Sequence, residues 1–280
     1  AGAGAADDLL LVLEKDAATA RLLDWRTGAT VATWPTGPFP HEVVVSPDGR
    51  TAVVADYGAT EPGRTLTVLD LPGRRVARTI PLGDYRRPHG IVWLAGAASP
   101  QVAVTVEANQ AVLVVDVAAG RVLRAVETGE RGTHMLAVAP DGRTAYTANI
   151  GGGTVSQLDL AAGTRLRTVR TGAGPEAMDL TPDGRELWVA DRVRHVVQVR
   201  DARTLDSLAA WPTGAFPNRL RFTPDGRLAL VSNAAAGTLS VYDVASRTLR
   251  GTVAFPYDST RARPSALTAP IGRGAVPLGG

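Results

Sequence analysis

The sequence has no cysteine among its 280 residues. This absence excludes a disulfide framework, a thiol nucleophile and any zinc or iron–sulfur site built on cysteine. There is also no apolar run near the ~18–20 residues that a membrane-spanning helix requires. Because 45% of the residues are still hydrophobic, the chain can bury a substantial core, and its length fits one large domain better than two.

Lysine and aromatic residues are scarce. Of the 30 lysines and arginines only Lys15 is lysine, which leaves 29 arginines, a bias that we interpret mainly as GC-rich coding. The net charge of +3 is small for this length and does not by itself indicate a nucleic-acid partner. Aromatic residues make up only 5%, so base stacking is not favoured. The nucleophile elbow, the His-Glu-x-x-His motif, the P-loop and the dinucleotide fingerprint are all missing.

The first residues are small and two aspartates follow them, from Ala1 to Asp8. This pattern is typical of a mature end left by signal-peptide cleavage, although an expression scar or a trimmed chain would look the same. We therefore expect an exported protein, periplasmic or secreted.

A repeat of about forty residues dominates the sequence. The phrase Pro-Asp-Gly begins at Pro47, Pro140, Pro182 and Pro224, and the last three are 42 residues apart. The long gap after Pro47 holds one degenerate unit, in which residues 96–100 replace the phrase. Alternating β-branched runs on both sides of a Pro-Asp-Gly turn predict hairpins, and four short strands per repeat are typical of β-propeller blades.

We therefore predict an all-β fold, a single propeller domain of four-stranded antiparallel blades over residues 1–280. The predicted units are a partial first blade, five further blades and an irregular tail: 9–37, 41–83, 89–129, 133–172, 175–214, 217–257 and 258–280. The second, third and fourth strands each occur six times but the first only five times, so the chain begins inside a blade. Either the tail closes a six-bladed ring irregularly or the last blade is missing, and we favour the missing blade because an open sheet edge is a liability.

The repeats resemble the YVTN-repeat, or YncE-like, β-propeller family. The resemblance rests on Pro-Asp-Gly-Arg, on Val189-Ala190-Asp191 and on Tyr146-Thr147-Ala148-Asn149, and it extends from residue 9 to about 257. It implies a seven-bladed, exported bacterial propeller that serves as a binding or interaction module, with DNA binding in some members. Seven blades need about one repeat more than this chain contains, in agreement with a missing C-terminal blade.

One blade is also similar to propeller-type lactonases of the 6-phosphogluconolactonase kind. The similar stretches are Pro40-His41-Glu42, Pro47 to Arg50 and Val54 to Gly58. Any propeller repeat can carry such residues, so we treat this resemblance as a minor alternative.

Superposing the repeats reveals two columns of polar residues at one face, where the first strands begin and the second strands end. The inner column starts the first strands and contains His41, His89, His134, Glu176 and Asn218. Three of the four histidines thus share one position in consecutive blades. With Glu107 and Glu176 near, they predict a metal site with open positions, for zinc, copper, manganese or calcium. A purely structural role, by hydrogen bonding to the neighbouring blade, remains open, and we expect His195 to be a surface residue.

The second column ends the second strands and contains Glu14, Asp56, Glu107, Asn149, Asp191 and Asn233. We interpret it mainly as a series of turn-capping residues, with Asp56 and Glu107 as candidate exceptions because each follows a strand that begins with histidine. The recurring third-strand aspartates are predicted turn-makers: Asp70, Asp116, Asp159 and Asp243.

Further candidates for ligand binding lie at the same face. Arg86 and Arg87 precede His89, and Arg219 follows Asn218, so they can reach a carboxylate or phosphate; ordinary solvated arginine is the alternative. Asp56, Asn149 and Asn218 complete this set. Packing explains four of the tryptophans, and Trp25 is predicted to be a partly exposed turn residue.

Three functions remain open at this stage. The favoured one is a binding or interaction protein that uses the channel mouth, with a small molecule or protein as partner and a divalent metal on His41, His89 and His134. The second is a metal-assisted hydrolase of lactonase type, in which Glu107 or Glu176 is the general base. The third is a metal-free interaction scaffold.

Overall fold

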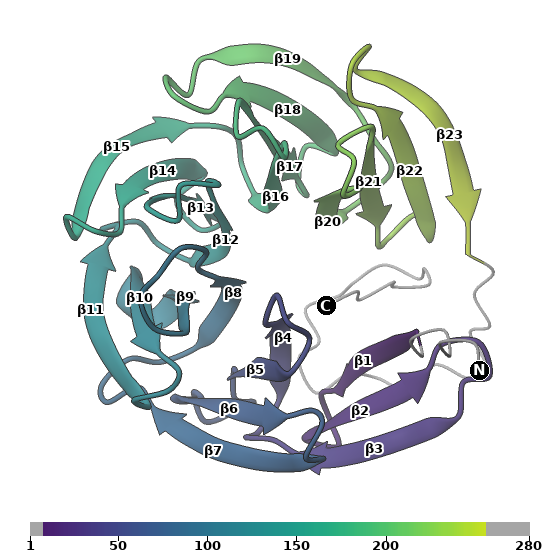
Figure 1. The fold of residues 1–280 in the computed structure, drawn as a ribbon. Helices are drawn as coiled ribbons and strands as arrows, with labels where there is room; N and C mark the ends of the chain where they lie inside the picture. Colours follow the sequence, from purple (N-terminus) through teal and green to yellow (C-terminus); the bar gives the residue numbers. More distant parts are fainter. Residues whose placement is uncertain (1–7, 256–280) are drawn as a thin grey trace.

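Six antiparallel sheets follow one another around a central axis in the computed structural model, which describes residues 8–255 (Figure 1). The sheets radiate outward like blades, which confirms the predicted β-propeller. Helix is confined, over this range, to one 3-10 turn, Glu107–Asn109, and no helix there is long and apolar enough to cross a membrane. The predictions of a cleaved leader at the start of the chain and of an irregular tail over 258–280 lie outside the described residues.

The strands fall into four classes by their place in a blade. The five innermost strands are β4 (Pro40–Val45), β8 (Pro88–Trp93), β12 (Thr133–Val138), β16 (Pro175–Leu180) and β20 (Pro217–Phe222). The second strands are β1 (Leu9–Glu14), β5 (Thr51–Asp56), β9 (Gln101–Val106), β13 (Thr144–Asn149), β17 (Glu186–Asp191) and β21 (Leu228–Asn233). The third strands are β2 (Thr19–Asp24), β6 (Thr65–Asp70), β10 (Ala111–Asp116), β14 (Thr154–Asp159), β18 (Val196–Asp201) and β22 (Thr238–Asp243). The outermost are β3 (Thr30–Pro35), β7 (Arg75–Pro81), β11 (Arg121–Glu127), β15 (Thr164–Arg170), β19 (Ser207–Pro212) and β23 (Thr248–Ala254).

The first sheet differs from the other five. Its order is β1-β2-β3, whereas the rest are four-stranded, for example β4-β5-β6-β7. Within residues 8–255 the innermost strand of this blade is therefore absent, as the strand count predicts. The prediction of a seventh, missing blade is not tested by the described residues.

The Pro-Asp-Gly phrases form the turns between innermost and second strands. The glycine takes the left-handed conformation in each, as at Gly49 (φ 69°) and Gly142 (φ 65°). In the first of these turns, the Gly49 amide donates to the Ser46 carbonyl oxygen over 2.8 Å. Only glycine adopts this φ without steric cost, so the phrase fixes each hairpin at the face opposite the histidines.

The hydrophobic core lies between neighbouring blades. Val53, Leu66, Val104 and Leu113, from adjacent sheets, are all fully buried in one cluster. Each such side chain contributes roughly 1.5–3 kcal/mol on burial. The tryptophans largely follow the packing prediction, since Trp34 and Trp188 are buried, whereas Trp25 is 58% exposed.

Candidate functional site

A β-bulge begins each innermost strand. Where the innermost strand β4 pairs with β5, Pro40 is opposite Asp56 and Glu42 is opposite Ala55, so His41 has no partner in the register. His134 is likewise skipped between Thr133 and Met135. The same irregularity falls at the remaining members of the inner column, which are His89, Glu176 and Asn218. Because a bulge frees a residue from the ladder and re-aims its side chain, the repeat presents the inner column at one channel face, which we call the channel mouth.

The three histidines form a continuous stack at the channel mouth. The rings of His41 and His89 have centroids 4.1 Å apart, and those of His89 and His134 are 3.9 Å apart. Gly90 allows this approach, because a Cβ at that position would lie 2.9 Å from the His134 carbonyl oxygen and 2.9 Å from the Leu136 amide nitrogen. The structure therefore brings together the three side chains that the sequence places in one column.

One end of the stack is an ion pair. The Nδ1 atom of His134 contacts Oε1 of Glu107, whose Oε2 accepts a 2.7 Å hydrogen bond from the Tyr57 hydroxyl. Burial would lower the pKa of His134, but Glu107 and Glu176 outweigh it and raise that pKa. Burial would raise the pKa of Glu107, and the contacts with His134 and Tyr57 lower it instead. Glu107 is thus an ionised carboxylate held beside the stack.

Two further carboxylates from different blades meet around one arginine. Arg219 contacts Glu42, and its Nη1 lies 3.8 Å from Oε1 of Glu176. Glu176 also accepts from Arg192 over 2.7 Å and lies 3.6 Å from Nε2 of His134. Burial opposes ionisation of both carboxylates, yet the positive groups lower the pKa of Glu176, and Arg219 and His41 bring the pKa of Glu42 to about 2. These contacts cross the channel, since Glu42 lies on β4 and Arg219 on β20.

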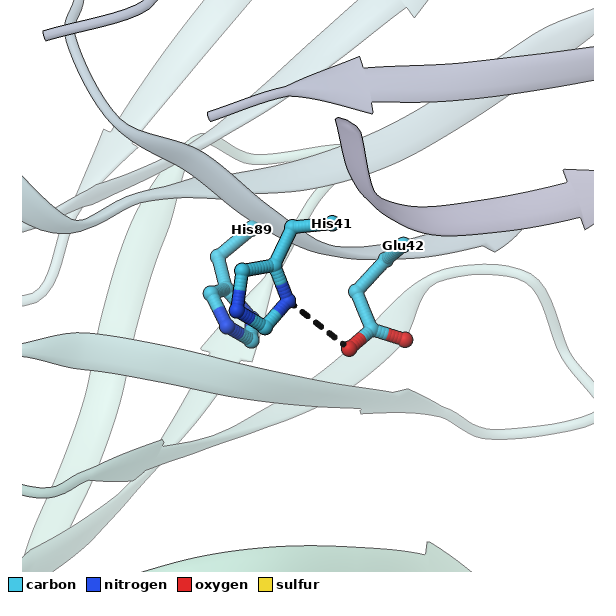
Figure 2. Close-up of side chains that lie close together, drawn as sticks. All are labelled: His41, Glu42 and His89. Atoms are coloured by element: carbon cyan, nitrogen blue, oxygen red, sulfur yellow. Dashed lines mark hydrogen bonds and ion pairs between the residues drawn. The ribbon is translucent and has the colours of Figure 1, made fainter. Parts of the chain in front are cut away.

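The other end of the stack is occupied by the single lysine. Lys15 Nζ lies 3.0 Å from His41 Nε2, and His41 Nδ1 lies 3.4 Å from Oε1 of Glu42 (Figure 2). Burial lowers the pKa of His41, so its ring is neutral at neutral pH. His41 therefore has partners on both ring nitrogens.

His89 in the middle of the stack has none. Its side chain is 1% exposed, and neither Nδ1 nor Nε2 has a hydrogen-bond partner among residues 8–255. Burial, followed by the charges of His134 and His41, lowers the pKa of His89 well below its ordinary value. A buried polar group without partners costs free energy, so this imidazole is a position where a ligand is expected.

Two groups of side chains around His89 have a spacing that suits a metal ion. The first comprises His41, Glu42 and His89 (Figure 2), and the second His89, Glu107 and His134. In each group, one ligand atom per residue lies within 4.8 Å of the others. Arg219 and Lys15 directly contact the first group, and their positive charges oppose a cation there. Once a metal displaces the proton of His134, the second group offers two imidazoles and one carboxylate, a donor set that suits zinc and other transition metals.

The second column behaves mainly as a set of caps. Asp56 accepts from the hydroxyls of Thr65 and Thr67 and from the Gly37 amide. Asn149 makes equivalent bonds within its own blade, donating to Thr154 over 3.1 Å and Ser156 over 2.9 Å. Asn233 repeats the pattern, and Asp191 binds backbone amides instead. Glu107 differs from them because its carboxylate contacts His134 of the next blade, so the structure adds Glu107 to the stack and leaves Asp56 and Asn149 outside it.

The predicted ligand-binding arginines do not converge. Arg86 donates to the Gly83 carbonyl oxygen over 2.8 Å, whereas Arg87 donates to Gly58 over 2.9 Å and lies 4.8 Å from the centre of the Tyr57 ring. Arg219 is engaged with the carboxylates described above.

Asn218 of the inner column and His195, the fourth histidine, lie apart from the stack. Asn218 is buried and accepts a 3.0 Å bond from Ser232, which is a structural contact. His195 is exposed, as expected, and its Nδ1 accepts from the Phe216 amide.

Four residues of the site escape the sequence analysis: Lys15, Glu42, Tyr57 and Arg192. Lys15 stands out as the one lysine in the chain, but GC-rich coding also explains why lysine is rare. Glu42 is adjacent to His41, yet its partner Arg219 is 177 residues away. Only the ring of blades brings such positions together.

One cavity among the described residues lies away from the channel mouth. It has a volume of about 690 Å³ and is lined by Pro47, Asp70, Trp93 and Ser99, at the opposite end of the strands. Its polar side chains already have hydrogen-bond partners: Asp70 accepts from the Gly73 amide, and the Ser99 hydroxyl donates to Asp116. No unpartnered side chain of the described residues points to a ligand there.

Comparison with known proteins supports the same fold. A family model described as YNCE-like beta-propeller matches residues 92–255, which is more than half of the chain. No curated protein matches the sequence.

Proposed function

The chain belongs to the YNCE-like β-propeller family, and we propose that it is a binding protein that holds a divalent metal ion at the channel mouth on His89, Glu107 and His134. A bound ion with positions left open would fix a small molecule or a partner side chain there.

The unpartnered imidazole of His89 carries this proposal. His41, at the same bulge position of the preceding blade, has a partner on each ring nitrogen, Lys15 and Glu42. His89 is buried without any such partner among the described residues, and such a loss costs about 1–3 kcal/mol. A metal–nitrogen bond would offset that cost.

Glu107 and His134 complete the proposed coordination set around His89. Glu107 supplies the negative charge, and Tyr57 fixes its other oxygen by a 2.7 Å hydrogen bond. Such contacts to the ligands raise metal affinity by orienting the donors. Glu176, at 3.6 Å from His134 Nε2, is placed to orient that ring from the far side.

The hydrolase alternative has weaker support. A general base needs a pKa near the working pH. Glu107 is a ligand in this proposal, and Glu176 is paired with Arg192 and has a lowered pKa. The proposal therefore assigns binding without turnover, and sustained hydrolysis of simple lactones by the metal-loaded protein would contradict it.

The test is zinc binding by isothermal titration calorimetry, with elemental analysis after dialysis. We expect about one ion per chain for the wild type and at least a 10-fold loss of affinity in His89→Leu, because metal sites depend strongly on each ligand. His195→Asn is the matched control, since it removes a histidine that lies outside the stack and suits the left-handed backbone there (φ 56°). Equal affinity of His89→Leu and wild type, or no binding of zinc, copper or manganese by either, would reject the metal site and leave a metal-free scaffold.

A further inference from the structure

Lys15 lies in the turn between β1 and β2, at the edge of the channel mouth. Its Nζ is 3.0 Å from Nε2 of His41 and 5.7 Å from the centre of the Phe39 ring. The residue is half-buried and not fully enclosed. The remaining 29 basic residues are arginine, and this position therefore has the only side-chain amine of the chain.

The hydrogen-bond network assigns the state of His41. An ammonium group can only donate, so Nε2 accepts from Lys15, and the ring proton is on Nδ1. Nδ1 lies 3.4 Å from Oε1 of Glu42 (Figure 2). Arg219 contacts Glu42 in turn. An amine, a neutral imidazole beside it and a carboxylate behind the imidazole form the arrangement of an activated nucleophile, its base and the group that orients the base.

The charged groups around Lys15 favour release of its proton. Burial is the largest effect and Arg219 adds to it, while Glu42, Glu176 and Asp16 oppose them, and together they lower the pKa of Lys15 to about 8. Arginine cannot lose its proton near neutral pH, so an arginine at position 15 would not be a nucleophile.

We propose that Lys15 is a nucleophilic amine that forms an imine with small aldehydes or ketones, with His41 as its base. The nitrogen lone pair attacks the carbonyl carbon and forms the C–N bond, while the C=O π electrons move to oxygen. The amine proton passes to His41 Nε2 and from His41 to the alkoxide oxygen, giving a neutral carbinolamine. His41 then takes the remaining proton from the nitrogen as the C=N bond forms and passes it to the departing hydroxyl, so the C–O bond breaks and water leaves. One carbonyl compound is thus bound as an imine and one water is released. This chemistry uses none of the three proposed metal ligands.

The test is reductive trapping of the full chain with acetaldehyde and cyanoborohydride at pH 7.5, read at Lys15 by peptide mass spectrometry. The reference is a free peptide of residues 9–24, in which the lysine has its ordinary pKa. We expect at least roughly 10-fold faster trapping in the folded protein, because a much larger fraction of its amine is unprotonated. In His41→Gln, which retains a polar side chain but removes the base, trapping is expected to fall roughly 10-fold with an unchanged melting temperature.

The controls separate this proposal from the metal site. Lys15→Arg removes the trapped product, and His195→Asn leaves the rate unchanged. Trapping continues in His89→Leu and with a chelator present, so failure of metal binding does not affect the result. A rate for Lys15 no faster than that of the peptide overturns the proposal, even if a variant does not fold. Equal rates for wild type and folded His41→Gln reject the role of His41.

Discussion

The two polar columns at the channel mouth repeat with the same period but have different hydrogen-bond partners. Asp56, Asn149 and Asn233, at the ends of the second strands, bond mainly to hydroxyls of the following strands. The histidines, at the starts of the innermost strands, contact residues of other blades or, for His89, no polar partner among the described residues. A repeated polar residue satisfied by its own repeat is explained by the fold, whereas one that reaches across repeats needs another explanation.

The largest expected effect tests whether Asp56 is only a cap. Asp56 is fully buried, and burial raises its pKa from 3.8 to about 6 despite its three hydrogen-bond donors. The stability that this shift contributes is present below pH 4 and is lost as the pH rises through 6. We expect Asp56→Asn, which recreates the cap of Asn149, to be more stable than the wild type by about 3 kcal/mol at pH 8 and equal to it near pH 4.

Urea unfolding between pH 4 and pH 8 measures this difference. Asn149→Asp is the mirror variant and should acquire the same loss of stability with rising pH. A constant difference between Asp56→Asn and the wild type over this range would show that the Asp56 carboxylate has a partner beyond its cap.

The next effect tests the cap itself. Asn149→Ala removes bonds to Thr147, Thr154 and Ser156, and we expect a loss of about 2 kcal/mol, because each bond contributes roughly 0.5–1.5 kcal/mol. Urea denaturation at neutral pH measures the loss, and metal binding in the same variant should be unchanged. Weaker zinc binding by Asn149→Ala would join the two columns into one site.

A change in the histidine column should have the opposite sign. In buffer with a chelator, His89→Leu is expected to increase the unfolding free energy by about 1–2 kcal/mol, since it replaces two unpartnered nitrogens with apolar atoms. The melting temperature, measured by circular dichroism, reports the gain. A clear loss of stability would mean that His89 has a structural role and would remove the contrast between the columns.

The smallest effect belongs to the third-strand aspartates. Asp243 accepts from the Ser246 amide over 2.9 Å in an exposed turn, and Asp70 and Asp116 make equivalent bonds. These contacts agree with the predicted turn-makers. We expect Asp243→Ala to lower the melting temperature less than Asn149→Ala does, and a larger drop would indicate that the exposed turns contribute more than the buried caps.

The sequence by itself determined the propeller and the common position of His41, His89 and His134. These features depend on local patterns: turn residues with fixed φ, alternation of apolar residues and a repeat of 42 residues. Even the alignment of the inner column follows from the repeat, because each of the five innermost strands begins with a bulge at the same place.

Only the tertiary structure decided how the side chains at the channel mouth pair. Whether His89 lacks a partner while His41 has two depends on where Lys15, Glu42 and Arg219 meet, and these residues come from three different blades. Neighbouring charges decide the protonation of these buried groups, since Arg219 and His41 bring the pKa of Glu42 to about 2 against the effect of burial, whereas burial raises the pKa of Asp56. Distances across the ring and exclusion of water are properties of the assembled blades, and no local pattern in the chain encodes them.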